Sequence, residues 1–96
     1  MNVRFDAAAD ADVTEAFGWY EGQIQGLGDD FIAEVGKSVE LIGENPTAYP
    51  VIEALARRAV VHRFPYCIYY VVEGDHIRVL ACFHAKRNPV VWKLRV

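Results

Sequence analysis

Apolar residues recur with helical spacing in the first half of the chain, after a short alternation at Val3 and Phe5 that predicts a strand. We expect Asp12 to be the N-cap of a first helix, with Glu15 three residues later as in a capping box. The apolar stripe that follows consists of Val13, Ala16, Phe17, Tyr20 and Ile24.

A second helix is predicted after the break at Gly26-Leu27-Gly28, with Asp29 or Asp30 as its N-cap. Its apolar face consists of Ile32, Val35, Val39 and Ile42. Asn45-Pro46 ends this helix, because a residue before proline disfavours the helical conformation. The first half therefore predicts a hairpin of two amphipathic helices.

From Arg57 onward the apolar period changes from about 3.6 to 2, which is typical of strands. Three strands are predicted over residues 58–64, 66–73 and 76–84, and Gly74-Asp75 is a typical two-residue hairpin turn. The predicted fold class is α+β, in the order β-α-α-β-β-β, with the helical hairpin packed on a small antiparallel sheet.

The hairpin turn also predicts which residues face each other on the last two strands. Tyr69 should oppose Leu80, and Cys67 should oppose Cys82. The face expected under the helices consists of Ile68, Tyr70, Val72, Ile77, Val79, Ala81 and Phe83. The second face would hold Cys67, Tyr69, Val71, Leu80 and Cys82 with His76, Arg78 and His84. Two helices cannot cover both faces, so we expect the second face to be open to a partner.

The same register places His62, Cys67 and Cys82 in one row, with His84 diagonal to it. Zinc sites with a recognisable sequence pattern have closely spaced ligand pairs, which this chain lacks. A disulfide is also not expected, because cysteines in a hydrogen-bonded pair aim their side chains poorly at each other. We therefore predict two buried, reduced thiols, with no metal and no cofactor.

Length and composition limit the kind of protein. The chain has 96 residues, of which 53% are hydrophobic and 24% charged, so we expect one globular domain over residues 1–96. Two-domain enzymes and doubly wound cofactor folds are excluded. No apolar run approaches the ~20 residues of a membrane span, and the N-terminus lacks the apolar core of a signal peptide. We expect a cytoplasmic protein that does not bind membranes.

The formal charge of −3 is divided unevenly along the chain. Residues 1–53 hold two basic and eleven acidic side chains, whereas residues 54–96 hold eight basic and two acidic ones, which gives −9 and +6. Either the second half meets an anionic partner, or its lysines and arginines protect exposed strand edges.

Several short motifs occur in an order that resembles the RelE/ParE toxin superfamily, and the ParE branch most. They are Trp19-Tyr20-Glu21, Gly28-Asp29-Asp30-Phe31, Pro46 to Tyr49-Pro50, Arg57-Arg58, Phe64-Pro65-Tyr66-Cys67-Ile68-Tyr69-Tyr70, Phe83-His84-Ala85-Lys86-Arg87-Asn88-Pro89 and Trp92. The resemblance covers nearly the whole chain. It implies the toxin of a type II toxin–antitoxin system, of the kind linked to plasmid stabilization and growth arrest, neutralised by a cognate antitoxin.

ParE-like toxins inhibit DNA gyrase by binding, whereas RelE-like toxins cleave messenger RNA on the ribosome. Here Cys67 stands where the RelE pattern has an arginine, His62 lies in what would be a lysine-rich strand, and Trp92 lies near the place of a tail tyrosine. These departures favour the gyrase inhibitor. An endoribonuclease would need another set of groups for proton transfer and charge stabilisation. The candidates for that set are His62, Arg63, His84 and Arg87. A toxin that binds its partner and harms nothing is a third alternative.

Two sets of contact residues follow from these expectations. The residues predicted to bind gyrase are Arg57, Arg58, Arg63, Arg78, Lys86, Arg87, Trp92, Lys93 and Arg95. Those predicted to bind the antitoxin are Trp19, Tyr20, Tyr69, Arg78 and Leu80. Trp19 and Tyr20 are adjacent in a helix, so both cannot face the core, and Trp92 either contacts the target or packs on the second face. DNA would be contacted only through the antitoxin or gyrase.

Overall fold

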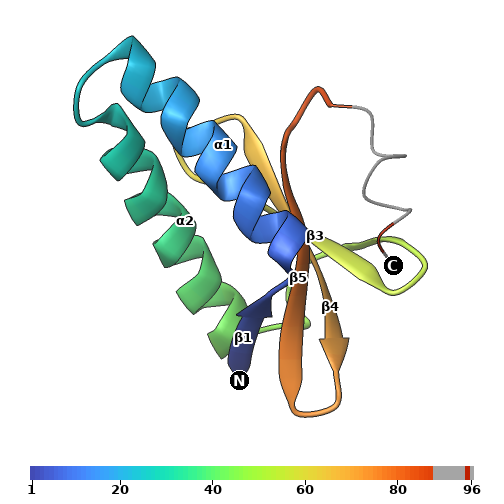
Figure 1. Cartoon of the computed structure of the whole chain (residues 1–96). Helices are drawn as coiled ribbons and strands as arrows, with labels where there is room; N and C mark the ends of the chain where they lie inside the picture. The colour runs from blue at the N-terminus through green and yellow to red at the C-terminus, as the bar shows by residue number, and fades with distance from the viewer. Residues whose placement is uncertain (88–94, 96) are drawn as a thin grey trace.

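A hairpin of two helices packs on one face of a five-stranded sheet in the computed structural model, which describes residues 1–87 and 95 (Figure 1). The elements are β1 (Asn2–Phe5), α1 (Ala7–Gln23), α2 (Leu27–Glu44), β2 (Val51–Glu53), β3 (Ala56–Val60), β4 (Tyr66–Glu73) and β5 (His76–His84). Neither helix is long and apolar enough to cross a bilayer. The predicted α+β class, with a helical hairpin on a small sheet, is confirmed.

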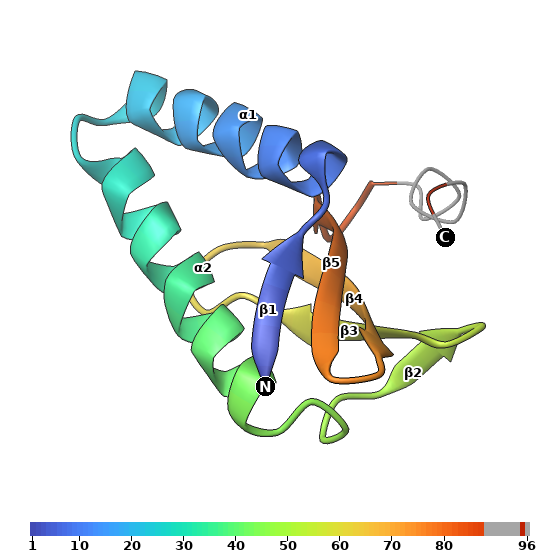
Figure 2. The ribbon, with the colours of Figure 1, turned by 60° about the horizontal axis from the view of Figure 1, so that its bottom comes forward.

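The sheet has the strand order β1-β5-β4-β3-β2 and is mixed rather than wholly antiparallel (Figure 2). The first strand pairs in parallel with β5, from Asn2 opposite His76 to Phe5 opposite Val79. The helical hairpin then leads the chain to the far edge of the sheet, where β2 pairs with β3. A strand of three residues is too short to give a clear alternation, which is why β2 was not predicted.

Helix α1 begins five residues earlier than Asp12, at Ala7, with Asp6 as its N-cap, so the predicted N-cap is wrong. Alanine is the best helix former, and Ala7-Ala8-Ala9 extends the helix back to the end of β1. Asp12 consequently lies inside the helix, on the side of the sheet.

Helix α2 also begins earlier than predicted, with Gly26 as its N-cap at φ 90°, a left-handed conformation that glycine adopts without strain. The Glu21 carboxylate of α1 accepts hydrogen bonds from the N–H groups of Gly26, at 2.9 Å, and Gly28, at 3.0 Å. A negative group at the start of α2 also suits the helix dipole. Glu21 therefore takes the role expected of Asp29 or Asp30.

An aromatic cluster forms the core where the helices meet the sheet. Tyr20 and Phe31 contribute from the two helices, Phe64 from the β3–β4 connection and Tyr66 from β4. The rings of Tyr20 and Phe64 are 4.9 Å apart and those of Phe31 and Tyr66 5.1 Å apart, both edge to face. Phe31 is fully buried, whereas Ile32, which the sequence placed in the apolar stripe, is 42% exposed.

A β-bulge changes which residues of β5 face the helices. Tyr70 pairs with Val79 and Tyr69 with Ala81, so Leu80 is an extra residue on β5. Every later residue of β5 is therefore shifted by one position, and the predicted pairs of Tyr69 with Leu80 and of Cys67 with Cys82 are wrong. Beyond the bulge, Ala81 and Phe83 belong to the face away from the helices, and Cys82 to the core beneath them. His84 is brought to the helix side, where its ring meets that of Tyr66 edge to face.

The second face of the sheet is not the open surface that the sequence predicted. Its cluster consists of Ala56, Cys67, Tyr69, Val71, Leu80, Ala81 and Phe83, with Ile52 of β2 packed against it. Tyr69 is 4% exposed and Leu80 fully buried, so neither side chain is open to an antitoxin. Arg58 and Val60 of β3 remain exposed there.

The neighbouring residues Phe31 and Ile32 test the placement of α2. Replacing Phe31 by alanine should lower the free energy of unfolding by about 3–5 kcal/mol, because a cavity opens in the aromatic cluster. Ile32→Ala removes a half-exposed side chain and should lower the free energy of unfolding by less than about 1 kcal/mol. Urea denaturation measures both. Equal losses for the two variants would contradict this placement.

Candidate functional site

A groove with a volume of about 530 Å³ runs between α1 and the end of β5. It is lined by Asp12, Glu15, Ala16, Trp19, Tyr20, Pro65, Tyr66, Cys82, Phe83, His84 and Arg87. Cys82 and Phe83 belong to opposite faces of the sheet, yet both line the groove. The groove therefore follows the edge of β5 rather than one of its faces.

Trp19 is the exposed aromatic residue of this groove. It is 60% exposed, whereas Tyr20 is 8% exposed and lies in the aromatic cluster. The two rings meet edge to face, with centroids 5.1 Å apart, so the buried ring supports the exposed one. Of the two adjacent aromatic residues, Trp19 is available to a partner and Tyr20 belongs to the core.

Asp12 and Arg95 close part of the β5 edge where β1 has ended. The Asp12 carboxylate accepts a hydrogen bond of 3.1 Å from the Cys82 N–H and pairs with the Arg95 guanidinium at 2.7 Å. Arg95 also donates to the Leu80 carbonyl, at 3.1 Å, and its guanidinium lies over the Phe83 ring. The Asp12 side chain is 8% exposed, so these contacts are well shielded from water. Arg95, a predicted gyrase contact, here joins α1 to β5.

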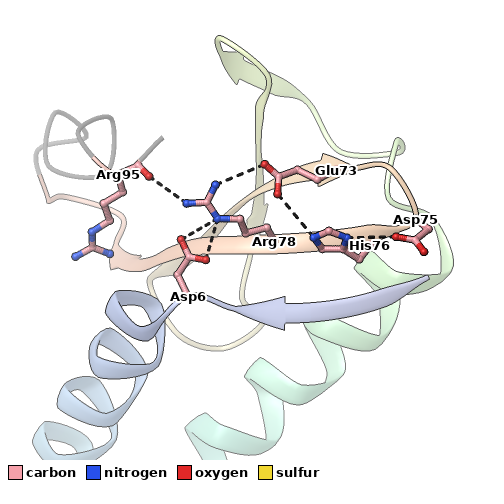
Figure 3. A network of polar contacts seen from close by, with 6 residues as sticks. All are labelled: Asp6, Glu73, Asp75, His76, Arg78 and Arg95. Atoms are coloured by element: carbon pink, nitrogen blue, oxygen red, sulfur yellow. Dashed lines mark hydrogen bonds and ion pairs between the residues drawn. The ribbon is translucent and has the colours of Figure 1, made fainter.

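Arg78, which was predicted for both partners, lies at the centre of a polar network (Figure 3). Its Nε donates to both carboxylate oxygens of Asp6, at 2.9 and 3.0 Å, and its guanidinium lies 3.5 Å from Glu73. It also reaches the carbonyl oxygen of Arg95, at 3.4 Å, and Glu73 lies 3.7 Å from His76. The paired carboxylates raise the pKa of Arg78. The network ties together the ends of β1 and β4, the start of β5 and Arg95.

His62 and Arg63 hold the β3–β4 connection against α2. The Nδ1 atom of His62 lies 3.1 Å from Glu34, and the Arg63 guanidinium lies 3.6 Å from Asp30. Strand β3 ends at Val60, short of the predicted residue 64. Arg63 adopts a left-handed φ of 72°, which interrupts the extended backbone before Phe64 enters the core.

The other predicted cations have separate surroundings. Arg57 donates to the carbonyl groups of Thr47 and Tyr49, at 3.1 and 2.6 Å, and so fixes the loop after α2. Arg58 is exposed and interacts with the Tyr69 phenol, whose pKa is raised by burial. Lys86 and Arg87 are exposed directly after β5, and the Arg87 guanidinium lies 4.0 Å from the centre of the Phe83 ring.

Two predicted contacts, Trp92 and Lys93, lie outside the described residues. Seven residues of the groove were not among the predicted site residues, namely Asp12, Glu15, Ala16, Pro65, Tyr66, Cys82 and Phe83. The bulge that brings Phe83 to the edge has no sequence pattern of its own, so it could not be anticipated.

The two cysteines are free thiols on opposite faces of the sheet. Burial raises the pKa of Cys82 to about 12 and also raises that of Cys67, so both remain protonated at neutral pH. Across residues 1–87 and 95, no three histidine, cysteine or acidic side chains gather in a way that would hold a metal ion. The groove therefore offers aromatic, cationic and backbone groups for recognition.

Comparisons with known proteins add two findings. A family model described as the ParE toxin of the type II toxin–antitoxin system parDE matches residues 3–89. The fold is similar to that of a chain in the solved chromosomal ParDE TA system from P. aeruginosa, with a TM-score of 0.78 and 17% sequence identity. That similarity covers 88% of this chain and 95% of the other. No curated protein sequence matches.

Substitutions at Asp12 and Thr14, both in α1, distinguish the contribution of the edge contacts to stability from that of the helix itself. In Asp12→Ala the Cys82 N–H loses its acceptor and Arg95 loses its carboxylate, which should cost about 2–3 kcal/mol of stability. Thr14→Ala, at an exposed position, should change stability by less than about 0.5 kcal/mol. Thermal or urea unfolding distinguishes them. A loss in Asp12→Ala no larger than in Thr14→Ala would show that the contacts contribute little.

The Glu34 pair should make stability depend on acid pH. Hydrogen bonds from Lys37 and His62 hold the pKa of Glu34 below its ordinary value of 4.5. The group therefore stabilises the fold above about pH 4.5, and this contribution is lost as the pH falls through the lowered pKa. We expect unfolding free energies measured between about pH 3 and 7 to fall less steeply in Glu34→Gln than in the wild type. The exposed Glu40→Gln is the control and should follow the wild-type curve.

Proposed function

The chain belongs to the ParE toxin family of type II toxin–antitoxin systems, and from this premise we propose that it is a toxin which inhibits DNA gyrase by binding and which a cognate antitoxin neutralises. Both proposed partners are proteins of the bacterial cytoplasm, where we expect it to act. Expression without the antitoxin should arrest growth.

Binding is favoured over RNA cleavage by the surroundings of the four candidate catalytic residues. His62 and Arg63 are engaged with Glu34 and Asp30 of α2. RNA cleavage requires a proton acceptor and several cations around one phosphate. Of the four candidates, only His84 and Arg87 line the groove, whereas His62 and Arg63 lie against α2, so the set does not surround one site.

The position of Lys86 and Arg87 is the observation that carries the proposal for gyrase. Both are exposed, and neither pairs with a carboxylate of residues 1–87. By contrast, Arg63, Arg78 and Arg95 form ion pairs inside the chain. We therefore place the target-binding surface at Lys86 and Arg87, with Arg58 as a further exposed cation of the second half. Trp92 and Lys93 stay part of the proposal on sequence grounds alone.

The antitoxin is proposed to bind at Trp19 and the groove beside it. An exposed tryptophan supported by a buried ring is a typical anchor in protein interfaces, because it buries a large apolar area at a small entropic cost. This assignment leaves Tyr20 a core role and removes Tyr69 and Leu80 from the contact set.

Gyrase inhibition can be tested with two charge reversals of equal size. The purified wild-type chain should inhibit supercoiling by purified gyrase. The Lys86→Glu variant should inhibit it about fivefold or more weakly, because opposite charges steer the association of proteins. Arg4→Glu makes the same change in the acidic half, on β1, and should act like the wild type. Inhibition should also weaken with added salt.

No inhibition by the intact chain would remove the gyrase proposal. If messenger RNA ends mapped after expression then showed cuts within translated reading frames, the endoribonuclease would replace it.

A further inference from the structure

The outer edge of β5 offers backbone hydrogen-bonding groups beyond the end of β1. The last hydrogen bond of the β1 side joins the Asp6 N–H to the Val79 carbonyl, at 3.0 Å. Further along, the Cys82 N–H donates to Asp12, so the backbone of Cys82 points away from β4. Because strand residues alternate, His84 points the same way. Among residues 1–87 and 95, no strand or side chain bonds to the Cys82 carbonyl or the His84 N–H on this edge.

These two groups have the spacing that one residue of a parallel strand requires. In a parallel pair, a residue donates its N–H to one carbonyl of the neighbouring strand and accepts from the N–H two residues further along. An antiparallel strand would instead need both the N–H and the C=O of one residue, Cys82 or His84. The Cys82 N–H already donates to Asp12, at 3.1 Å, and the His84 carbonyl already accepts from the Arg87 N–H, at 2.9 Å. The free groups therefore select an extended chain that runs parallel to β5, as β1 does.

We propose that an extended segment of the antitoxin adds to the outer edge of β5 as a parallel strand, with one of its residues bridging Cys82 and His84. The proposal rests on the proposed function for the partner, and it adds how that partner is bound. The groove lies where such a strand would bind, since it follows the edge of β5 and is lined by residues of both faces of the sheet. Strand addition to an open edge is a common mode of peptide recognition.

The side chains of the groove define the chemistry of the segment. Trp19 and Ala16 of α1 offer an apolar surface, so we expect an apolar or aromatic residue that packs against Trp19. At the end of β5, Lys86 and Arg87 are exposed cations, and a carboxylate of the segment would complement them. The occupant is thus an extended peptide with an apolar or aromatic residue that packs against Trp19 and an acidic residue near Arg87.

An N-methyl scan tests strand addition directly. Overlapping 12-residue peptides covering the antitoxin encoded beside this chain's gene are titrated against the full chain. The peptide that binds is then methylated at one backbone nitrogen at a time. Methylation of the bridging residue should weaken binding about tenfold or more, while methylation of either adjacent residue should have little effect. A uniform profile, or losses spaced three or four residues apart, would indicate another mode and overturn the proposal.

Variants of His84 test the same bond from the protein side. His84→Pro removes the N–H from an edge position, and His84→Ala removes the imidazole but keeps the N–H. We expect the whole antitoxin to bind His84→Pro about tenfold more weakly than His84→Ala, and to bind Trp19→Ala more weakly than the wild type. Equal affinities of the two His84 variants would overturn the proposal. If His84→Pro does not fold, the methyl scan decides alone.

These outcomes separate the inference from the function on which it rests. If the antitoxin binds the wild-type chain, but neither backbone methylation of the peptide nor His84→Pro weakens binding, strand addition is wrong and the proposed function stands. An antitoxin that does not bind the wild-type chain removes both.

Discussion

Strand β1 is shorter than β5, and much of the structure depends on this difference in length. Past Val79 no strand of residues 1–87 pairs with the outer backbone groups of β5, and a buried group without a partner is costly. The chain meets this constraint with side chains, since Asp12 accepts from Cys82 and Arg95 donates to Leu80. The same contacts fix α1 beside the edge, so the groove and its exposed Trp19 lie where the strand pairing stops. The candidate site is thus a consequence of how the edge of the sheet is completed.

Part of the uneven charge of the sequence is used inside the molecule. Among the described residues, contacts that join an acidic residue of the first half to a basic residue or histidine of the second include Asp6–Arg78, Asp12–Arg95, Asp30–Arg63 and Glu34–His62. Exposed pairs of this kind contribute about 0–1 kcal/mol each, so they orient the two halves more than they stabilise them. The shielded Asp12–Arg95 pair is the strongest candidate for a larger contribution. The charge pattern of the sequence fits an anionic partner or a protected strand edge, and the structure adds internal pairing as a third use of the charge.

Periodicity was sufficient to predict the two helices and the β4–β5 hairpin, because helical and strand spacings of apolar residues differ clearly over segments of this length. It did not predict β2 or the parallel pairing of β1. It placed β4 and β5 at their observed bounds and separated Trp19 from Tyr20 by their directions around α1. It failed at Leu80, where a bulge reverses the faces of the last residues of β5. A bulge depends on how a strand fits its neighbours in three dimensions, and nothing in the local sequence marks this one. The candidate groove, which contains Phe83 only because of the bulge, was therefore beyond prediction.

The position of Arg87 links the two proposed activities. It lines the groove in which the antitoxin strand would lie, and it is also one of the exposed cations assigned to gyrase. A strand that pairs with the edge of β5 up to His84 would continue past Arg87 and cover its guanidinium, which rests on the Phe83 ring 4.0 Å away. One guanidinium cannot serve both partners at once, so the antitoxin and gyrase would exclude each other. Neutralisation would then follow from occupation of a shared surface, without any change in the shape of the toxin.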